Sequence, residues 1–178
     1  VFTLTNSGKL DIEDKLENLD SNITTETITE DINIKKNVIS KLKYDNNIFS
    51  NTSSLSVDGL GKNINILHFM NPITVPIVEL YETKSIVKSD LNKVIKSLET
   101  LSYNIIRVKN TPGFLVNRIL FKNISYFFYL HENEKVKSED LKKIYKNLFN
   151  IDPIKIVNMI GLDTCLSILV NFNKYDKD

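Results

Sequence analysis

The residues best suited to chemistry lie between Asn51 and Glu79, where one of only two histidines, His68, ends an apolar run. The segment after His68 contains a proline and cannot continue a helix, and Glu79 ends a second apolar run. Histidine titrates near neutral pH, and a carboxylate beside it fixes its tautomer and stabilises its cation. His68 and Glu79 are therefore a candidate acid–base pair. Their spacing alone nevertheless favours a plainer interpretation, a hydrogen-bonded strand-end histidine and a surface glutamate.

Composition and charge exclude several classes of partner. Of the 178 residues, 42% are hydrophobic and 25% charged, an ordinary globular balance for one large or two small domains. The net charge of +1 predicts neither nucleic acid nor an anionic membrane surface as the main partner. The single cysteine, Cys165, excludes an internal disulfide and a cysteine metal cluster. We therefore expect no metal site and a reducing, cytoplasmic location, with no membrane span and no signal peptide.

The first part of the chain alternates between strand and helix patterns. We first expect a short helix around 10–19 and a poor strand at 24–29. A helix capped by Asp31 follows, with Ile34, Val38, Ile39 and Leu42 on one face. After it we expect a very short strand at 48–49, strands at 64–68 and 78–81, a helix capped by Ser89, and a buried strand at 105–108. This alternation predicts a small parallel or mixed sheet covered by helices.

The pattern changes at Thr111-Pro112-Gly113, after which only helices are predicted. The segment 115–130 is apolar nearly all round, which indicates a buried helix or a subunit interface. Ser138 is expected to cap a helix with Leu141, Ile144 and Leu148 inward, and Pro153 to open a last helix reaching Leu169. We place the domain boundary near Asn110, between an α/β domain at 1–109 and an all-α domain at 110–178.

Four motifs, in this order, resemble the 3-hydroxyacyl-CoA dehydrogenase family. They are NTSSLS at 51–56, HFMNP at 68–72 followed by IVE at 77–79, TPGFLVNRIL at 111–120, and IGLDTCLSI at 160–168. The segment ETITED at 26–31, with Lys35, is also similar to the family's stretch after a strand of the nucleotide domain. The resemblance runs from about Gly8 to Leu169 and is strongest to the short bacterial type that acts on 3-hydroxybutyryl-CoA.

The resemblance implies a two-domain oxidoreductase of fatty acid β-oxidation. A Rossmann-like NAD-binding domain would be followed by a helical domain like the C-terminal domain of 6-phosphogluconate dehydrogenase, through which the enzyme forms a homodimer. Acyl-CoA would bind between the two domains. The enzyme would move a hydride between the 3-carbon of the acyl chain and the nicotinamide.

The resemblance also assigns roles to individual residues. His68 would be the general base that removes the 3-hydroxyl proton, and Glu79 its orienting partner. Ser53 and Asn117 would hydrogen-bond the substrate oxygens. The residues expected beside the cofactor are Glu30, Lys35, Asn51 and Asn71. Without the resemblance, Ser53 is a turn-forming serine, Asn117 caps or solvates a helix, and Glu30 and Lys35 form a solvated first helical turn.

The family's glycine-rich nucleotide turn, G-x-G-x-x-G, does not occur among the five glycines of this sequence. We therefore expect a partial Rossmann-like domain that lacks its first βαβ half, in a chain truncated at both ends. Two hypotheses follow. The chain is a piece of an NAD-dependent dehydrogenase that acts with its missing part, or it is a catalytically silent relative that serves as an acyl-CoA-binding or dimerising module.

Overall fold

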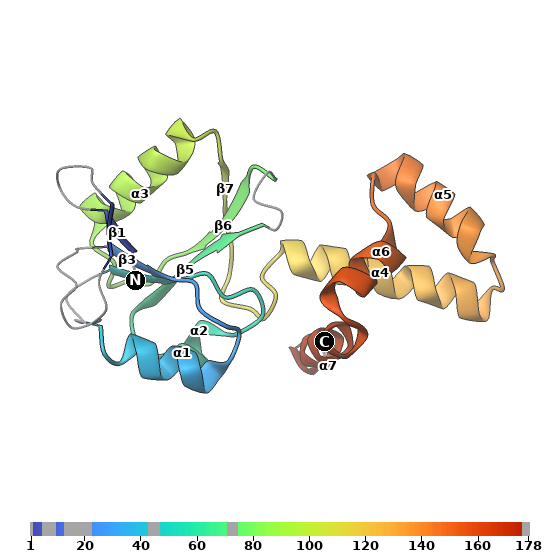
Figure 1. Cartoon of the computed structure of the whole chain (residues 1–178), viewed down its shortest axis with the longest axis horizontal. Coiled ribbons are helices and arrows are strands. Elements are labelled where there is room, and N and C mark those ends of the chain that lie inside the picture. Colours follow the sequence, from blue (N-terminus) through green and yellow to red (C-terminus); the bar gives the residue numbers. More distant parts are fainter. Residues whose placement is uncertain (1, 5–9, 13–22, 43–46, 71–74, 176–178) are drawn as a thin grey trace. The chain divides into compact units, whose positions relative to one another are not determined.

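The computed structural model describes residues 2–4, 10–12, 23–42, 47–70 and 75–175 (Figure 1). Side chains are described for these residues except 2–4, 10–12, 171 and 173–175. The chain forms two compact units, Val1–Thr111 and Pro112–Asp178, and each is considered by itself. The elements of the first unit are β1 (Phe2–Leu4), β2 (Leu10–Ile12), β3 (Ile23–Glu26), α1 (Ile32–Ile39), β4 (Asn47–Ser50), α2 (Val57–Leu60), β5 (Ile64–Phe69), β6 (Ile77–Tyr81), α3 (Lys88–Thr100) and β7 (Asn104–Arg107). Those of the second are α4 (Val116–Asn133), α5 (Ser138–Phe149), α6 (Pro153–Ile160) and α7 (Leu162–Tyr175).

The main sheet of the first unit has the order β3-β4-β5-β6-β7. Strands β3, β4 and β5 run parallel, β6 is antiparallel to β5, and β7 is parallel to β6. The predicted mixed sheet with covering helices is therefore confirmed. The helix expected around 10–19 is wrong at its start, because Leu10–Ile12 is strand β2, paired with β1 in a separate antiparallel sheet. Residues 13–19 lie outside the described residues.

Helices cover both faces of the main sheet, with α3 on one side and α1 and α2 on the other (Figure 1). The core under α3 is a cluster of apolar side chains, namely Phe49, Leu67, Val78, Leu80, Ile86, Leu91 and Leu98. Successive side chains of a strand point to opposite faces. His68, next to Leu67, and Glu79, between Val78 and Leu80, therefore point to the face away from α3.

Helix α1 begins where the sequence predicts. The side chain of Asp31 accepts hydrogen bonds from the backbone N–H groups of Asn33 and Ile34, as an N-cap should. The predicted apolar face is only partly right, because Ile34 is 48% exposed whereas Lys35 is 1% exposed and Ile39 is 2% exposed. The helix is rotated so that Lys35 and Ile39, one turn apart, face inward.

Two predictions about α3 and β7 need correction. The N-cap position of helix α3 is Val87, whose side chain makes no capping hydrogen bond, and Ser89, the predicted cap, lies in the first turn. Strand β7 has the predicted position but is not buried, and Ile106 is 37% exposed. The physical reason is that β7 is an edge strand of the main sheet, so only one neighbour covers it.

The second unit is helical, as predicted, with two apolar clusters along α4. In one cluster Phe121, Ile124, Val157, Cys165 and Phe172 pack together. The other consists of Phe127, Leu141 and Tyr145. Helix α4 is therefore not buried all round, and its exposed side chains include Ile119, Tyr126 and Tyr129.

Helix α5 turns a different face inward from the one predicted. Leu141 is buried as expected, but Ile144 is 49% exposed and Leu148 is 69% exposed. Tyr145 takes the inward position because its ring packs edge-on against Phe127 and its hydroxyl donates to the backbone oxygen of Asn123. Ser138 is the first residue of the helix, and Lys137 occupies the cap position.

The single last helix predicted from Pro153 is in fact two helices. Gly161 separates α6 from α7 with φ of 94°, a conformation that L side chains rarely adopt. The axes of Pro153–Ile160 and Leu162–Val170 differ by 97°. In the described part of the chain no single helix is long and apolar enough to span a membrane, and this bent pair meets the length and composition criteria only when taken together.

Candidate active site

His68 and Glu79 lie directly opposite each other on the antiparallel strands β5 and β6. Opposite residues of an antiparallel ladder have Cβ atoms about 5 Å apart on one face, so the register alone brings these two side chains within reach. Nδ1 of His68 is 2.8 Å from Oε2 of Glu79. Glu79 is fully buried and His68 is 5% exposed. The interpretation of Glu79 as a surface glutamate is therefore wrong.

This contact determines what the histidine can do chemically. When Glu79 is ionised its carboxylate only accepts hydrogen bonds, and Nδ1 of His68 is then the donor while the lone pair of the neutral ring is on Nε2. If Nε2 takes up a proton, the buried charge of Glu79 stabilises the resulting cation. The pair is therefore built to remove a proton from a hydroxyl group and to return it.

The carboxylate of Glu30 fixes the loop that follows β4. Its Oε1 accepts from the hydroxyl of Thr52 at 2.6 Å, from the backbone N–H groups of Ser53 at 2.9 Å and Ser54 at 2.8 Å, and from both serine hydroxyls at 3.3 and 2.9 Å. Partial burial raises the pKa of Glu30, but the hydrogen bonds from Thr52, Ser54 and Ser53 outweigh it and hold the pKa below its ordinary value. Glu30 is therefore a loop anchor and not part of a solvated helical turn.

Lys35 is enclosed beneath this loop. Its Nζ donates to Oε1 of Glu26 at 2.7 Å and to the backbone oxygen of Ile28 at 3.1 Å, and it lies 3.7 Å from Oε2 of Glu30. With 1% exposure, its side chain is not a solvated lysine. In the structure Lys35 has an internal position, from which it contacts Glu26 directly and Glu30 at longer range. The expectation that Lys35 lies beside the cofactor stays a prediction.

Asn51, which directly follows β4, is hydrogen-bonded to the ends of the two strands that flank β4, namely β3 and β5. Its Oδ1 accepts from the backbone N–H of Phe69, the residue after His68, at 2.9 Å, and its own N–H donates to the backbone oxygen of Glu26 at 2.8 Å. The loop with Ser53 therefore lies beside the end of β5. This is the carboxyl end of the parallel strands β3, β4 and β5, where open α/β sheets bind ligands.

Two predicted residues are not placed with the others. Asn117 lies in the first turn of α4, within the second unit, and the structure describes that unit by itself. Asn71 falls outside the described residues. The structure thus brings together five of the eight residues inferred from the sequence. A sixth, Lys35, is buried next to Glu30, one of these five. The five are Glu30, Asn51, Ser53, His68 and Glu79.

Sequence reasoning did not identify Glu26, Ser50, Thr52 or Ser54 as members of this group. All four make hydrogen bonds within it. A carboxylate at the end of a strand, nine residues before a lysine in the following helix, was the available signal for Glu26. Among the described residues no group of three or more metal-ligating side chains is present.

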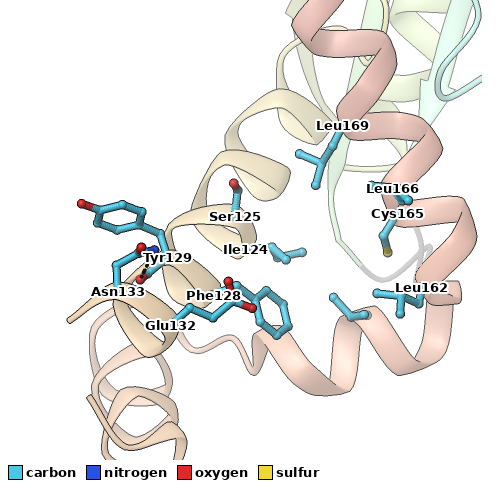
Figure 2. A pocket seen from close by; sticks show the side chains of 11 residues that line it. Ile124, Ser125, Phe128, Tyr129, Glu132, Asn133, Leu162, Cys165, Leu166 and Leu169 are labelled. Atoms are coloured by element: carbon cyan, nitrogen blue, oxygen red, sulfur yellow. Dashed lines mark hydrogen bonds between the residues drawn. The ribbon is translucent and has the colours of Figure 1, made fainter. Parts of the chain in front are cut away.

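The second unit contains an open apolar cavity of about 330 Å³ between α4, α6 and α7 (Figure 2). Its lining residues are Ile124, Ser125, Phe128, Tyr129, Glu132, Asn133, Val157, Leu162, Cys165, Leu166 and Leu169. Polar groups occur mainly on the α4 side, and Leu162 and Leu166 are 71% and 60% exposed. An open apolar surface of this kind suits a partner surface better than a small polar ligand.

Both parts of the chain match models of known domain families. Residues 5–111 match the NAD binding domain of 3-hydroxyacyl-CoA dehydrogenase, and residues 113–178 match its C-terminal domain. Among curated proteins the chain is similar to mitochondrial hydroxyacyl-coenzyme A dehydrogenase of Rattus norvegicus, with 27% identity over 171 residues, which is 89% of this chain and 54% of that protein. It is also similar to 3-hydroxybutyryl-CoA dehydrogenase of Clostridioides difficile, with 28% identity covering 84% of this chain and 58% of that protein.

Solved structures show the same likeness. The chain superposes on (S)-3-hydroxybutyryl-CoA dehydrogenase from Ralstonia eutropha with a TM-score of 0.73 and 29% identity, covering 88% of this chain and 60% of that one. A TM-score of 0.79 at 24% identity relates the fold to FadB2 from M. tuberculosis, covering 92% of this chain and 63% of that one. The chain spans about half the length of the first curated relatives it matches, at 54% and 53%.

Proposed function

Because the chain belongs to the 3-hydroxyacyl-CoA dehydrogenase family, we propose that it supplies the acid–base and substrate-binding side of an NAD-dependent 3-hydroxyacyl-CoA dehydrogenase. The reaction is hydride transfer between the 3-carbon of a 3-hydroxyacyl-CoA or 3-oxoacyl-CoA and the nicotinamide. The observation on which the proposal rests is the buried contact of 2.8 Å between His68 and Glu79, beside the loop with Ser53. Relatives named 3-hydroxybutyryl-CoA dehydrogenase support a short acyl chain. A relative named fatty acid oxidation complex subunit alpha supports a role in fatty acid β-oxidation.

In this proposal His68 moves the proton of the reaction. Its Nε2 removes the proton of the 3-hydroxyl group as the alcohol is oxidised, and returns it when a ketone is reduced. Glu79 keeps the ring in the required tautomer and stabilises the imidazolium that forms. Burial of both side chains limits competition from water for the same hydrogen bonds.

Ser53 and Asn117 hold the substrate oxygens in this proposal. Both are neutral hydrogen-bonding groups, so they can fix a hydroxyl or carbonyl oxygen without adding charge. For Ser53 the support is its position in a loop fixed by Glu30, which keeps its hydroxyl in a defined place. For Asn117 the support is the family motif at 111–120 and its place in the first turn of α4.

The described residues suit part of an NAD molecule. NAD, when bound, accepts the hydride from the 3-carbon. The partly exposed carboxylate of Glu30, at the carboxyl end of the parallel strands, is suited to hydrogen-bond ribose hydroxyl groups. Asn51 directly precedes Thr52, whose hydroxyl donates to Glu30. Because no G-x-G-x-x-G turn occurs in this sequence, we assign no residue to the pyrophosphate.

The cofactor assignment has a direct test in binding. We expect the purified 178-residue chain to bind NADH weakly or not at all, because the pyrophosphate would lack its backbone N–H donors. Titration of NADH with micromolar protein, followed by NADH fluorescence, measures this. A saturable change in fluorescence would show that these residues suffice for binding.

The missing glycine turn also favours a second candidate function. A catalytically silent relative would bind acyl-CoA, or dimerise, without turning over substrate. The two functions differ in one observation. In a dehydrogenase, supplying the nucleotide-binding half of the family, on the same polypeptide or another, produces NADH oxidation by acetoacetyl-CoA. In a silent module it produces acetoacetyl-CoA binding without NADH oxidation.

Self-association through the helical unit is a further part of the proposal. Its support is the exposed apolar side chains on α4, where Ile119 and Tyr126 are each 56% exposed, and the open apolar cavity lined by α4, α6 and α7. Large contiguous apolar patches on a protein surface mark interaction sites. We propose that a second copy of the chain covers this surface.

A further inference from the structure

Glu26 is a buried carboxylate that uses both of its oxygens at the end of β3. Oε1 accepts from the backbone N–H of Ile28 and from Nζ of Lys35, each at 2.7 Å. Oε2 accepts from the hydroxyl of Ser50 at 2.6 Å. The Ser50 hydroxyl in turn accepts from the backbone N–H of Thr52 at 3.3 Å. One side chain thus connects the segment leading to Glu30 with the loop containing Ser53.

Lys35 stands between two carboxylates at unequal distances. Its Nζ lies 2.7 Å from Oε1 of Glu26 and 3.7 Å from Oε2 of Glu30. Glu26 and Lys35 are each almost fully buried, whereas the Glu30 side chain is 35% exposed. The short contact therefore pairs Lys35 mainly with Glu26, and Lys35 holds Glu30 only through the longer ion pair of 3.7 Å.

This arrangement leaves Glu30 available to the loop. All five hydrogen bonds that Glu30 receives from Thr52, Ser53 and Ser54 go to its Oε1. The ion pair with Lys35 is made by the other oxygen, Oε2. If Lys35 lost its partner in the interior, an unpaired buried charge would result, and Glu30 is the nearest carboxylate that could relieve it. Movement of Glu30 toward Lys35 would withdraw it from the two serines.

We propose that Glu26 is a positioning residue of the candidate site, which keeps the contact of Lys35 with Glu30 at the longer distance of 3.7 Å and thereby keeps Glu30 hydrogen-bonded to the loop that contains Ser53. Ser50 serves the same end, because it orients the second oxygen of Glu26 and supports Thr52. The relevance of this to substrate binding rests on the function proposed above. The effect of Glu26 on the loop with Ser53 does not depend on that function and is measurable in the chain without any ligand.

The experiment is amide hydrogen exchange by NMR in the 178-residue chain and its Glu26→Gln variant. Glutamine has the same shape but no charge, so Lys35 loses its partner without a cavity being created. We expect exchange at the Ser53 and Ser54 amides to accelerate at least about tenfold, as expected when hydrogen bonds to a charged acceptor are lost. Their amide chemical shifts should also move, because Glu30 no longer accepts from them.

Two further variants separate positioning from a general loss of stability. The double variant Glu26→Gln/Lys35→Met removes the buried cation as well, so exchange at Ser53 should return to within about threefold of the unmodified chain. Asp90→Asn is the matched control, because this buried carboxylate binds Asn47 at the opposite end of β4. It should alter overall stability without selectively exposing Ser53.

Unchanged exchange at Ser53 and Ser54 in folded Glu26→Gln would overturn the proposal, as would equal acceleration in Asp90→Asn. If Glu26→Gln does not fold, Ser50→Ala breaks only the neutral link to Thr52 and should accelerate exchange at Thr52 and Ser53. No acceleration there would also count against the proposal. Failure of the proposed dehydrogenase function gives a different result. Acetoacetyl-CoA would then not change the amide signal of Ser53, while the effect of Glu26→Gln on amide exchange would persist.

Discussion

Replacing Glu79 by glutamine tests the proposed roles of the buried pair most specifically. The contact of 2.8 Å joins a fully buried carboxylate to Nδ1 of His68. Glutamine fits the same space, but its amide can donate as well as accept, so it no longer dictates which ring nitrogen carries the hydrogen. The charge that stabilises the imidazolium is also removed.

The expected loss of turnover depends on the protonation state of His68 in which the charge of Glu79 matters. While the ring is neutral, glutamine can still accept from Nδ1, so the tautomer with the hydrogen on Nδ1 remains available in the ground state. In the transition state the ring becomes cationic, and a hydrogen bond between charged partners contributes about 1.5–3 kcal/mol. Since about 1.36 kcal/mol corresponds to a tenfold change in rate, we expect kcat to fall roughly 10- to 150-fold.

The assay is acetoacetyl-CoA reduction, followed as loss of NADH absorbance, in a form of the protein that turns over. Ring nitrogen NMR shifts of His68 provide a second readout, since they should change from a single Nδ1–H tautomer to a mixture. The control is Glu82→Gln, because Glu82 directly follows β6 but binds only the exposed side chains of Lys88 and Arg107 in the contacts described. If Glu79→Gln retained full turnover, or behaved like Glu82→Gln, the assigned role of Glu79 would be wrong.

Three other predictions concern the loop, the helical unit and assembly. The hydrogen bonds of Glu30 lower its pKa, so they contribute fully above its ordinary value of 4.5 and are lost as pH falls through the lowered value. The protection factor of the Ser53 amide, which is its exchange rate corrected for the intrinsic rate at each pH, should therefore fall only at that acidic end, and a loss of protection near neutrality would contradict this. Gly113→Ala should destabilise the chain by about 2 kcal/mol or more in chemical denaturation, because φ is 73° and the new Cβ would lie 2.2 Å from the Phe172 ring; an unchanged midpoint would refute the packing described. Ile119→Lys should weaken self-association in sedimentation, and a clean monomer of the unmodified chain at high concentration would count against the interface.

Strand positions were predictable where apolar residues cluster in short stretches of sequence. The runs at 64–67 and 77–78 became β5 and β6, and these strands determine where His68 and Glu79 lie. That the two face each other was not predictable from spacing, because it depends on the antiparallel register between β5 and β6. A register change of one residue would have turned Glu79 to the α3 side of the sheet.

Helix faces were predicted less well, because long-range partners decide them. Apolar periodicity placed Ile34 inward, but the ion pair between Lys35 and Glu26, residues nine apart in sequence, turns Lys35 inward instead. In α5 the packing of Tyr145 on Phe127 likewise overrides the leucine and isoleucine stripe. Such side-chain networks are set by tertiary contacts that local periodicity does not encode.

The most direct test of the account is the His68→Ala variant in a form of the protein that reduces acetoacetyl-CoA. Turnover should be abolished, because the group that moves the hydroxyl proton is absent, while NADH binding measured in the same preparation should be nearly unchanged. A variant that kept most of its turnover would contradict the assignment of His68 as the general base, and with it the central claim.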